Sequence, residues 1–137
     1  MKKSLSLLLV LSLTGLDIGV AMAQRSGPRS SLPLRRVGQC ATTRITDIGY
    51  RLADERNRPI RDSGSHFSVA NGLGGVTYSR VPAVHRSRVG DRVRICLVSI
   101  PRGCPPGDDR GREYRTTNLR TRQSWVMPDS QHRCGGA

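Results

Sequence analysis

The chain has few aromatic residues: one Phe, one Trp and three Tyr in 137 residues. Proteins that hold single-stranded nucleic acid stack successive bases on several aromatic rings, so this scarcity argues against a dedicated single-strand binder. Trp125 is expected in the core, where most large aromatic side chains are found. The alternative for Trp125 is a platform on which a sugar or a base stacks.

Long apolar runs are also missing, and none reaches the ~20 residues that a membrane-spanning helix needs. The run at 5–13 is followed by Thr, Gly and Asp at 14–17. Two lysines precede this run and Ala-Met-Ala follows it at 21–23, which is the pattern of a signal peptide. We therefore expect cleavage before Gln24, and a periplasmic or secreted mature protein without a membrane span.

Acidic residues are scarce, since 10 Asp and Glu stand against 23 Lys and Arg, for a formal net charge of +13. The signal peptide contains both lysines and Asp17, so its removal lowers the net charge by one, to +12, and leaves arginine as the only basic residue type besides His. Arginine is an always-charged planar fork that suits phosphate and carboxylate groups. A GC-rich genome would favour the same composition, and both explanations stay open. The charge predicts attraction to an anionic polymer or an acidic envelope component, with nucleic acid as another option.

The four cysteines, Cys40, Cys96, Cys104 and Cys134, all lie in the mature part. An even number in a small exported chain predicts two disulfides. A zinc site is disfavoured, because zinc ligands usually come in Cys-x-x-Cys pairs with two intervening residues. Seven residues separate Cys96 from Cys104. Of the three possible pairings, we favour Cys96–Cys104 across a local loop and Cys40–Cys134 between the ends of the domain.

The mature chain is predicted to have two parts. Residues 24–39, "QRSGPRSSLPLRRVGQ", are rich in Arg, Ser, Pro and Gly and are typical of a flexible basic arm. Residues 40–137 are expected to form a single all-β domain, because no stretch has a helical pattern of ten or more residues. The expected architecture is a small antiparallel sandwich or barrel of about five or six strands, stapled by disulfides.

Several segments show strand signals. The clearest is 92–100, "RVRICLVSI". Val93, Ile95 and Leu97 are expected on one face of this strand, and Cys96, Val98 and Ile100 on the other. This strand is expected to start half-exposed and to end buried on both faces. Other strands are predicted at 41–52, in the hairpin around "NGLGG" (71–75), and in two segments at 112–118 and 121–127, whereas 53–65 is predicted to be a polar connection.

Arginines supply the candidate anion-binding residues. Two lie on the predicted strand at 92–100 and five near the C-terminal hairpin: Arg92, Arg94, Arg110, Arg112, Arg115, Arg120 and Arg122. The acidic pair Asp108 and Asp109 lacks the oxygen count and spacing of a calcium loop, so salt bridges to Arg110 and Arg112 are expected there instead. No metal or cofactor is predicted.

A catalytic alternative is a small secreted ribonuclease-like phosphodiesterase. Such an enzyme needs a carboxylate or His base, a His acid and arginines that hold the phosphate. His85, Glu113 and His132 are the candidates for the acid and base. The simpler interpretation places these histidines at the surface without a catalytic role.

The segments "SRVGD", "CLVSIPRGCPPGDDRG", "NLRTRQSW" and "DSQHRCGGA" resemble those of a set of small uncharacterised exported bacterial proteins. The resemblance covers most of 40–137. It implies bacterial export and a cysteine-bearing domain, and it implies no activity. The sequence thus favours a non-enzymatic arginine-rich binding module for an anionic envelope or extracellular partner.

Overall fold

The computed structural model describes residues 34–136. The predicted signal peptide and the arm up to residue 33 lie outside this range. The described residues form six strands and one short helix, in the order β1 (Cys40–Ala53), β2 (Pro59–Val69), β3 (Gly74–Thr77), α1 (Pro82–His85), β4 (Arg92–Ser99), β5 (Glu113–Asn118) and β6 (Ser124–Pro128).

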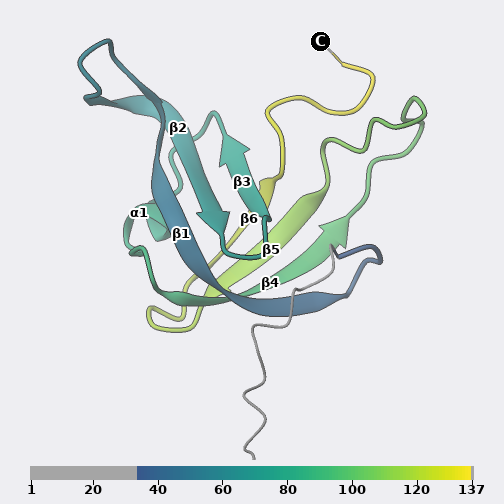
Figure 1. Ribbon diagram of the computed structural model, residues 1–137, viewed down its shortest axis with the longest axis horizontal. Helices are drawn as coiled ribbons and strands as arrows, with labels where there is room; N and C mark the ends of the chain where they lie inside the picture. The colour runs from purple at the N-terminus through teal and green to yellow at the C-terminus, as the bar shows by residue number, and fades with distance from the viewer. Residues whose placement is uncertain (1–33, 137) are drawn as a thin grey trace, which may run out of the picture.

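The six strands make one antiparallel sheet in the order β3-β2-β1-β4-β5-β6. The sheet curls strongly, so that its edge strands β3 and β6 come into contact (Figure 1). Within residues 34–136 no ladder of backbone hydrogen bonds joins β3 to β6, and the sheet therefore stays open. These findings confirm the prediction of a small antiparallel all-β domain with disulfides.

The core fills the inner side of the curved sheet. Val93, Ile95 and Leu97 of β4 have no exposed surface, which confirms the alternation predicted for this strand. Trp125 is also buried, as predicted for a core residue, and its ring meets that of Phe67 edge-on at 5.4 Å between centroids. Aromatic rings prefer this arrangement because the positive edge of one ring faces the negative face of the other.

The packed region begins before β1. Leu34 is buried in the core, and the Gly38 N–H donates a hydrogen bond to the Leu97 carbonyl. The Leu97 N–H in turn donates to the Gln39 carbonyl. Part of the predicted basic arm, residues 34–39, thus packs against the end of β4.

The outer face of β4 differs from the prediction. The strand was expected to end buried on both faces, but Val98 is only half-buried and Ile100 is 39% exposed. The physical reason is that the inner side of the curled sheet forms the core, while no second layer of described residues covers the outer face of β4. The prediction of a doubly buried strand end is therefore wrong.

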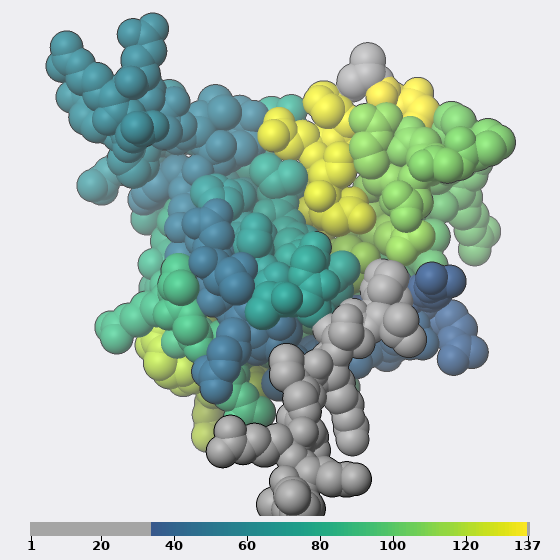
Figure 2. Space-filling model, in the orientation of Figure 1, coloured from purple at the N-terminus to yellow at the C-terminus, as the bar shows by residue number. Residues whose placement is uncertain are grey.

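The β1–β2 hairpin is longer than the sequence indicated. Residues 59–65 were predicted to belong to a polar connection, yet β2 begins at Pro59. The hairpin projects from the body of the domain (Figures 1 and 2), so both faces of its outer half are exposed. A strand without a buried face has no apolar alternation, and this is why the sequence pattern missed it.

The disulfides join Cys40 to Cys96 and Cys104 to Cys134, so the predicted pairing is wrong. Cys40 lies opposite Cys96 in the β1–β4 ladder, with 4.0 Å between their Cα atoms. The prediction relied on short sequence separation, whereas the ladder brings together cysteines that are 56 residues apart. Disulfides of this kind indicate an oxidising environment. No helix in residues 34–136 is long and apolar enough to cross a membrane.

The Cys40–Cys96 disulfide should hold the two halves of the sheet together. We expect replacement of both cysteines by Ser to lower the free energy of unfolding by about 4 kcal/mol in the chain-entropy model. Denaturant unfolding measures this change. Hydrogen exchange should also show lost protection of β1 amides between residues 40 and 44.

The Cys104→Ser/Cys134→Ser variant is the control, because its disulfide lies in loops outside the β1–β4 ladder. It should leave the amides of residues 40–44 protected under conditions in which the protein stays folded. Equal loss of protection in both variants would contradict a local role for Cys40–Cys96.

Candidate functional site

Four arginines gather on the outer face of β1, β4 and β5. Arg44 of β1 lies opposite Arg92 of β4, and Arg94 follows two residues further along β4. Arg115 of β5 lies opposite Cys96, beside Arg94. Because side chains alternate between the two faces of a strand, and Ile45, Val93, Ile95 and Tyr114 point into the core, all four arginines point outward. We call Arg44, Arg92, Arg94 and Arg115 the arginine face.

The arginine face carries unneutralised charge. All four side chains are exposed. None takes part in an ion pair within residues 34–136, and the only hydrogen bond found for their guanidinium groups runs from Arg44 to the Gly90 carbonyl. Like charges directly opposite one another in a ladder destabilise a sheet. The Arg44–Arg92 pair is therefore an arrangement that folding alone disfavours.

Small hydroxyl side chains surround these arginines. Thr42, Arg94, Thr117 and Ser124 follow one another across β1, β4, β5 and β6. The Thr117 and Ser124 hydroxyls share a hydrogen bond of 2.7 Å. Glu113 is the acidic residue on this side of β5, and it is half-buried at the start of the strand. Hydroxyls and guanidinium groups together present hydrogen-bond donors to an anion.

Two hollows of the domain lie elsewhere. A groove of about 440 Å³ runs along the β2–β3 hairpin and is lined mainly by residues 66–69 and 72–76. A second hollow lies at the tip of the β1–β2 hairpin. Neither is lined by a residue of the arginine face.

The sequence named seven candidate arginines, and the structure separates them. Arg92, Arg94 and Arg115 join the arginine face. Arg110, Arg112 and Arg120 each form an ion pair with an Asp. Arg122 lies in the turn between β5 and β6 with a positive φ of 58°.

Arg44 was missed by the sequence analysis. The buried Ile45 beside it shows that Arg44 points outward, and the alternation within β1 is a signal that could have indicated this orientation. Its position opposite Arg92 depends on strand pairing, which alternation does not reveal.

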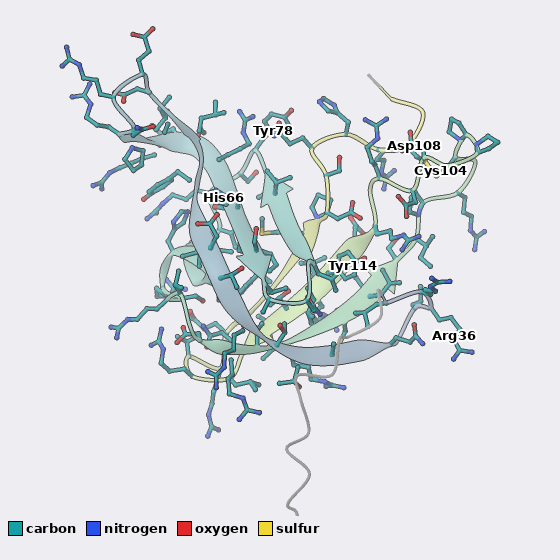
Figure 3. The ribbon with its side chains drawn as sticks, viewed as in Figure 1. Arg36, His66, Tyr78, Cys104, Asp108 and Tyr114 are labelled. Atoms are coloured by element: carbon teal, nitrogen blue, oxygen red, sulfur yellow. A yellow bond between two sulfur atoms is a disulfide. The ribbon has the colours of Figure 1, made fainter. Side chains whose placement is uncertain are left out.

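The segment "CPPGDDRG" is held by its own residues. Asp108 accepts two hydrogen bonds from the Arg110 guanidinium, both of 2.8 Å, and one from the Gly135 N–H. These bonds, first those from Arg110, lower the pKa of Asp108. Cys104, which is bonded to Cys134, lies on the same loop (Figure 3). With the Arg112–Asp109 pair, this confirms the salt bridges expected here.

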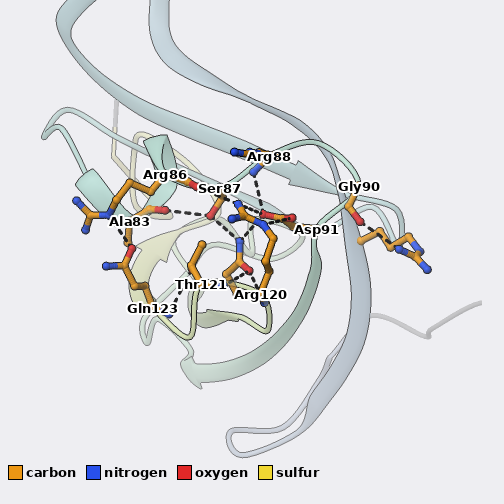
Figure 4. A network of polar contacts seen from close by, with 11 residues as sticks. Ala83, Arg86, Ser87, Arg88, Gly90, Asp91, Arg120, Thr121 and Gln123 are labelled. Atoms are coloured by element: carbon orange, nitrogen blue, oxygen red, sulfur yellow. Dashed lines mark hydrogen bonds and ion pairs between the residues drawn. The ribbon is translucent and has the colours of Figure 1, made fainter.

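A buried polar network closes one end of the core (Figure 4). Arg120 donates two hydrogen bonds to Asp91, of 2.7 and 2.8 Å. The Asn118 side-chain amide donates to Asp91 and to the Ser87 hydroxyl. Asn118 has no exposed surface. The network ties the segment between α1 and β4 to the β5–β6 turn, so Arg120 has a structural role.

The alternative catalytic residues lie on different parts of the domain. His85 stacks on Tyr50 at 4.2 Å, and its Nε2 is 2.9 Å from the Ser65 hydroxyl. The Ser65 hydroxyl also accepts a hydrogen bond from the Val81 N–H. Glu113 starts β5 on the outer face, and His132 is exposed after β6. No hydrogen bond or ion pair in the described residues joins these three candidates.

The environment of His85 favours its neutral form. Burial lowers the pKa of His85 below 6.5, and the charges of Arg80 and His66 lower it further. The ring also shares a hydrogen bond with the Ser65 hydroxyl and stacks on Tyr50. Both facts describe a histidine that holds α1 against β1 and β2.

We expect replacement of Asp91 by Ala to lower the free energy of unfolding by about 3 kcal/mol, because Arg120 and the buried Asn118 amide lose a shared acceptor. Denaturant unfolding at pH 7 measures the loss. The control is Asp62→Ala on the exposed β1–β2 hairpin, expected to change stability by less than about 0.5 kcal/mol. Similar losses in the two variants would contradict a structural role for the Asp91 network.

We expect the stability that His85 contributes to decrease as the pH falls. Its pKa is lowered in the folded state, so the unfolded chain binds the proton more readily, and folding loses free energy as the pH falls below about 6.5. Urea unfolding between pH 5 and 8 should therefore show a stability gap between the native chain and His85→Gln that narrows toward pH 5. A gap that stays constant or widens in acid would show that His85 is not held neutral.

Comparisons of the chain with protein-family models, with curated proteins and with solved structures find no match. The functional conclusion therefore depends on the chain's own residues. Of the features described above, the arginine face is the one that brings four arginines without ion pairs onto neighbouring strands.

Proposed function

We propose that the protein is a non-enzymatic binding module that holds an anionic polymer of the envelope or extracellular space on its arginine face. The observation that carries this proposal is the Arg44–Arg92 pair, which places two like charges opposite each other without a neutralising acid. An anionic ligand removes the resulting repulsion when it binds. The disulfides fit a periplasmic or secreted site of action, because such bonds persist in oxidising compartments.

The shape of the site favours a polymer over a small molecule. Small ligands bind in concave sites that bury most of their surface, and the two hollows described above lie away from the arginine face. The arginine face lies across three neighbouring strands, which are about 4.8 Å apart. Repeated charges along a polymer can contact several of its guanidinium groups at once.

The chemistry of the face favours contacts to charged groups rather than to bases or lipid chains. Its strands present no aromatic side chain on the outer side, so bases have no ring on which to stack. The apolar residues there, such as Val126 on β6, are few. Binding should therefore be dominated by arginine contacts and should weaken as salt is added.

Removal of the four charges should weaken polymer binding. We expect the variant with Arg44, Arg92, Arg94 and Arg115 all replaced by Gln to bind heparin, polyphosphate or duplex DNA at least tenfold more weakly at low salt. For duplex DNA, the slope of log K against log salt should become shallower by about 0.9 for each phosphate contact that is lost. Titrations at several NaCl concentrations measure both quantities.

A matched control removes the same charge elsewhere. Arg56, Arg61, Arg80 and Arg133 are exposed and form no ion pair within residues 34–136. Their replacement by Gln should reduce binding less than threefold. Equal weakening in the two variants would show that net charge alone drives binding, and salt-independent binding would contradict the proposal outright.

A further inference from the structure

The Cys40–Cys96 disulfide lies within the arginine face. Cys96 follows Arg94 by two residues on the outer side of β4, and Arg115 lies directly opposite Cys96 on β5. Cys40 and Cys96 are both partly exposed. Neighbouring strands are about 4.8 Å apart, and residues on one face of a strand repeat about every 6.6 Å. The guanidinium groups of Arg94 and Arg115 therefore lie within reach of the disulfide sulfur atoms.

We propose that Cys40–Cys96 is an exchange site for small anionic thiols. A thiolate attacks one sulfur atom and forms a mixed disulfide with it, and the other cysteine leaves as a thiolate. A second thiolate then attacks the mixed disulfide, which yields the free pair Cys40 and Cys96 and one oxidised disulfide of the small thiol. Two electrons pass from the two small thiols to the protein disulfide, and the cysteine thiolates take up protons from water.

Arginine promotes this exchange in two ways. Positive charge concentrates an anionic thiol at the site before it reacts, and such steering raises association rates by about 10- to 1,000-fold at low salt. The same charge stabilises the cysteine thiolate that leaves, as positive neighbours do at reactive cysteines. Arg94 and Arg115 are available for both effects, because neither has an ion-pair partner among the described residues.

The Cys104–Cys134 disulfide offers an internal comparison. It is also partly exposed, so a difference in exposure would not explain a difference in reactivity between the two disulfides. Its charge environment is mixed, because Asp108 binds the Gly135 N–H next to Cys134 and also neutralises Arg110. Arg102 and Arg133, which lie two residues and one residue from its cysteines, form no ion pair within residues 34–136, and Asp108 and Asp109 add negative charge to the same loop. An anionic thiol should therefore react with it more slowly.

The test compares thiols of different charge on the oxidised protein. Glutathione supplies a negatively charged thiol, 2-mercaptoethanol a neutral one and cysteamine a positively charged one. Alkylation followed by peptide mass spectrometry reports which disulfide has opened and how fast, and rates are expressed per thiolate. We expect glutathione to open Cys40–Cys96 at least tenfold faster than Cys104–Cys134 at low salt.

Salt and charge should both control this preference. At 1 M salt the screening length is about 3 Å, so the advantage of glutathione over cysteamine at Cys40–Cys96 should fall to less than threefold. The Arg94→Gln/Arg115→Gln variant should lose about tenfold in its rate with glutathione at low salt. The Arg56→Gln/Arg61→Gln variant, with the same charge change on the β1–β2 hairpin, should react as the native chain does.

Two outcomes would overturn the exchange site. One is that glutathione opens Cys104–Cys134 as fast as Cys40–Cys96, and the other is that Arg94→Gln/Arg115→Gln reacts at the native rate. The measurement contains no polymer. Loss of polymer binding and loss of thiol exchange can therefore be told apart, and either can fail while the other holds.

Discussion

The short ladder between β1 and β4 is the constraint on which the rest of the structure depends. It has five residue pairs, from Cys40–Cys96 to Arg44–Arg92, and it joins β3-β2-β1 to β4-β5-β6. Beyond Arg44, β1 leaves β4 and continues with β2 into the projecting hairpin. The same five pairs thus close the core on the inner side and bring cysteine and arginine side chains together on the outer side.

This ladder explains how a small domain with few aromatic residues stays folded. A small domain buries limited apolar surface and gains from covalent links. Cys40–Cys96 restrains the β1–β4 ladder that joins the two halves of the sheet, while Cys104–Cys134 restrains the long segment after β4. Asp91, Asn118 and Arg120 close one end of the core with hydrogen bonds instead of apolar contacts.

Local features could be predicted from the sequence, and long-range ones could not. The alternation of Val93, Ile95 and Leu97 is a property of one strand, so it indicated the buried face correctly. The Asp108–Arg110 ion pair spans two residues and was also expected. The disulfide pairing and the position of Arg44 opposite Arg92 depend on which strands are neighbours. One sequence contains no direct signal of that pairing, because the two strands lie about fifty residues apart along it.

The arginines fall into two groups that composition alone does not separate. Arg110, Arg112 and Arg120 pair with acids and help to hold loops in place, so the fold itself accounts for them. A genomic preference for arginine codons adds charge without regard to strand pairing. Such a preference does not explain why unpaired arginines occupy opposite positions in the one ladder that joins the sheet, where mutual repulsion costs stability. The proposed anionic ligand would account for both their clustering and their lack of acidic partners, and this is the physical reason why we propose a function for the arginine face.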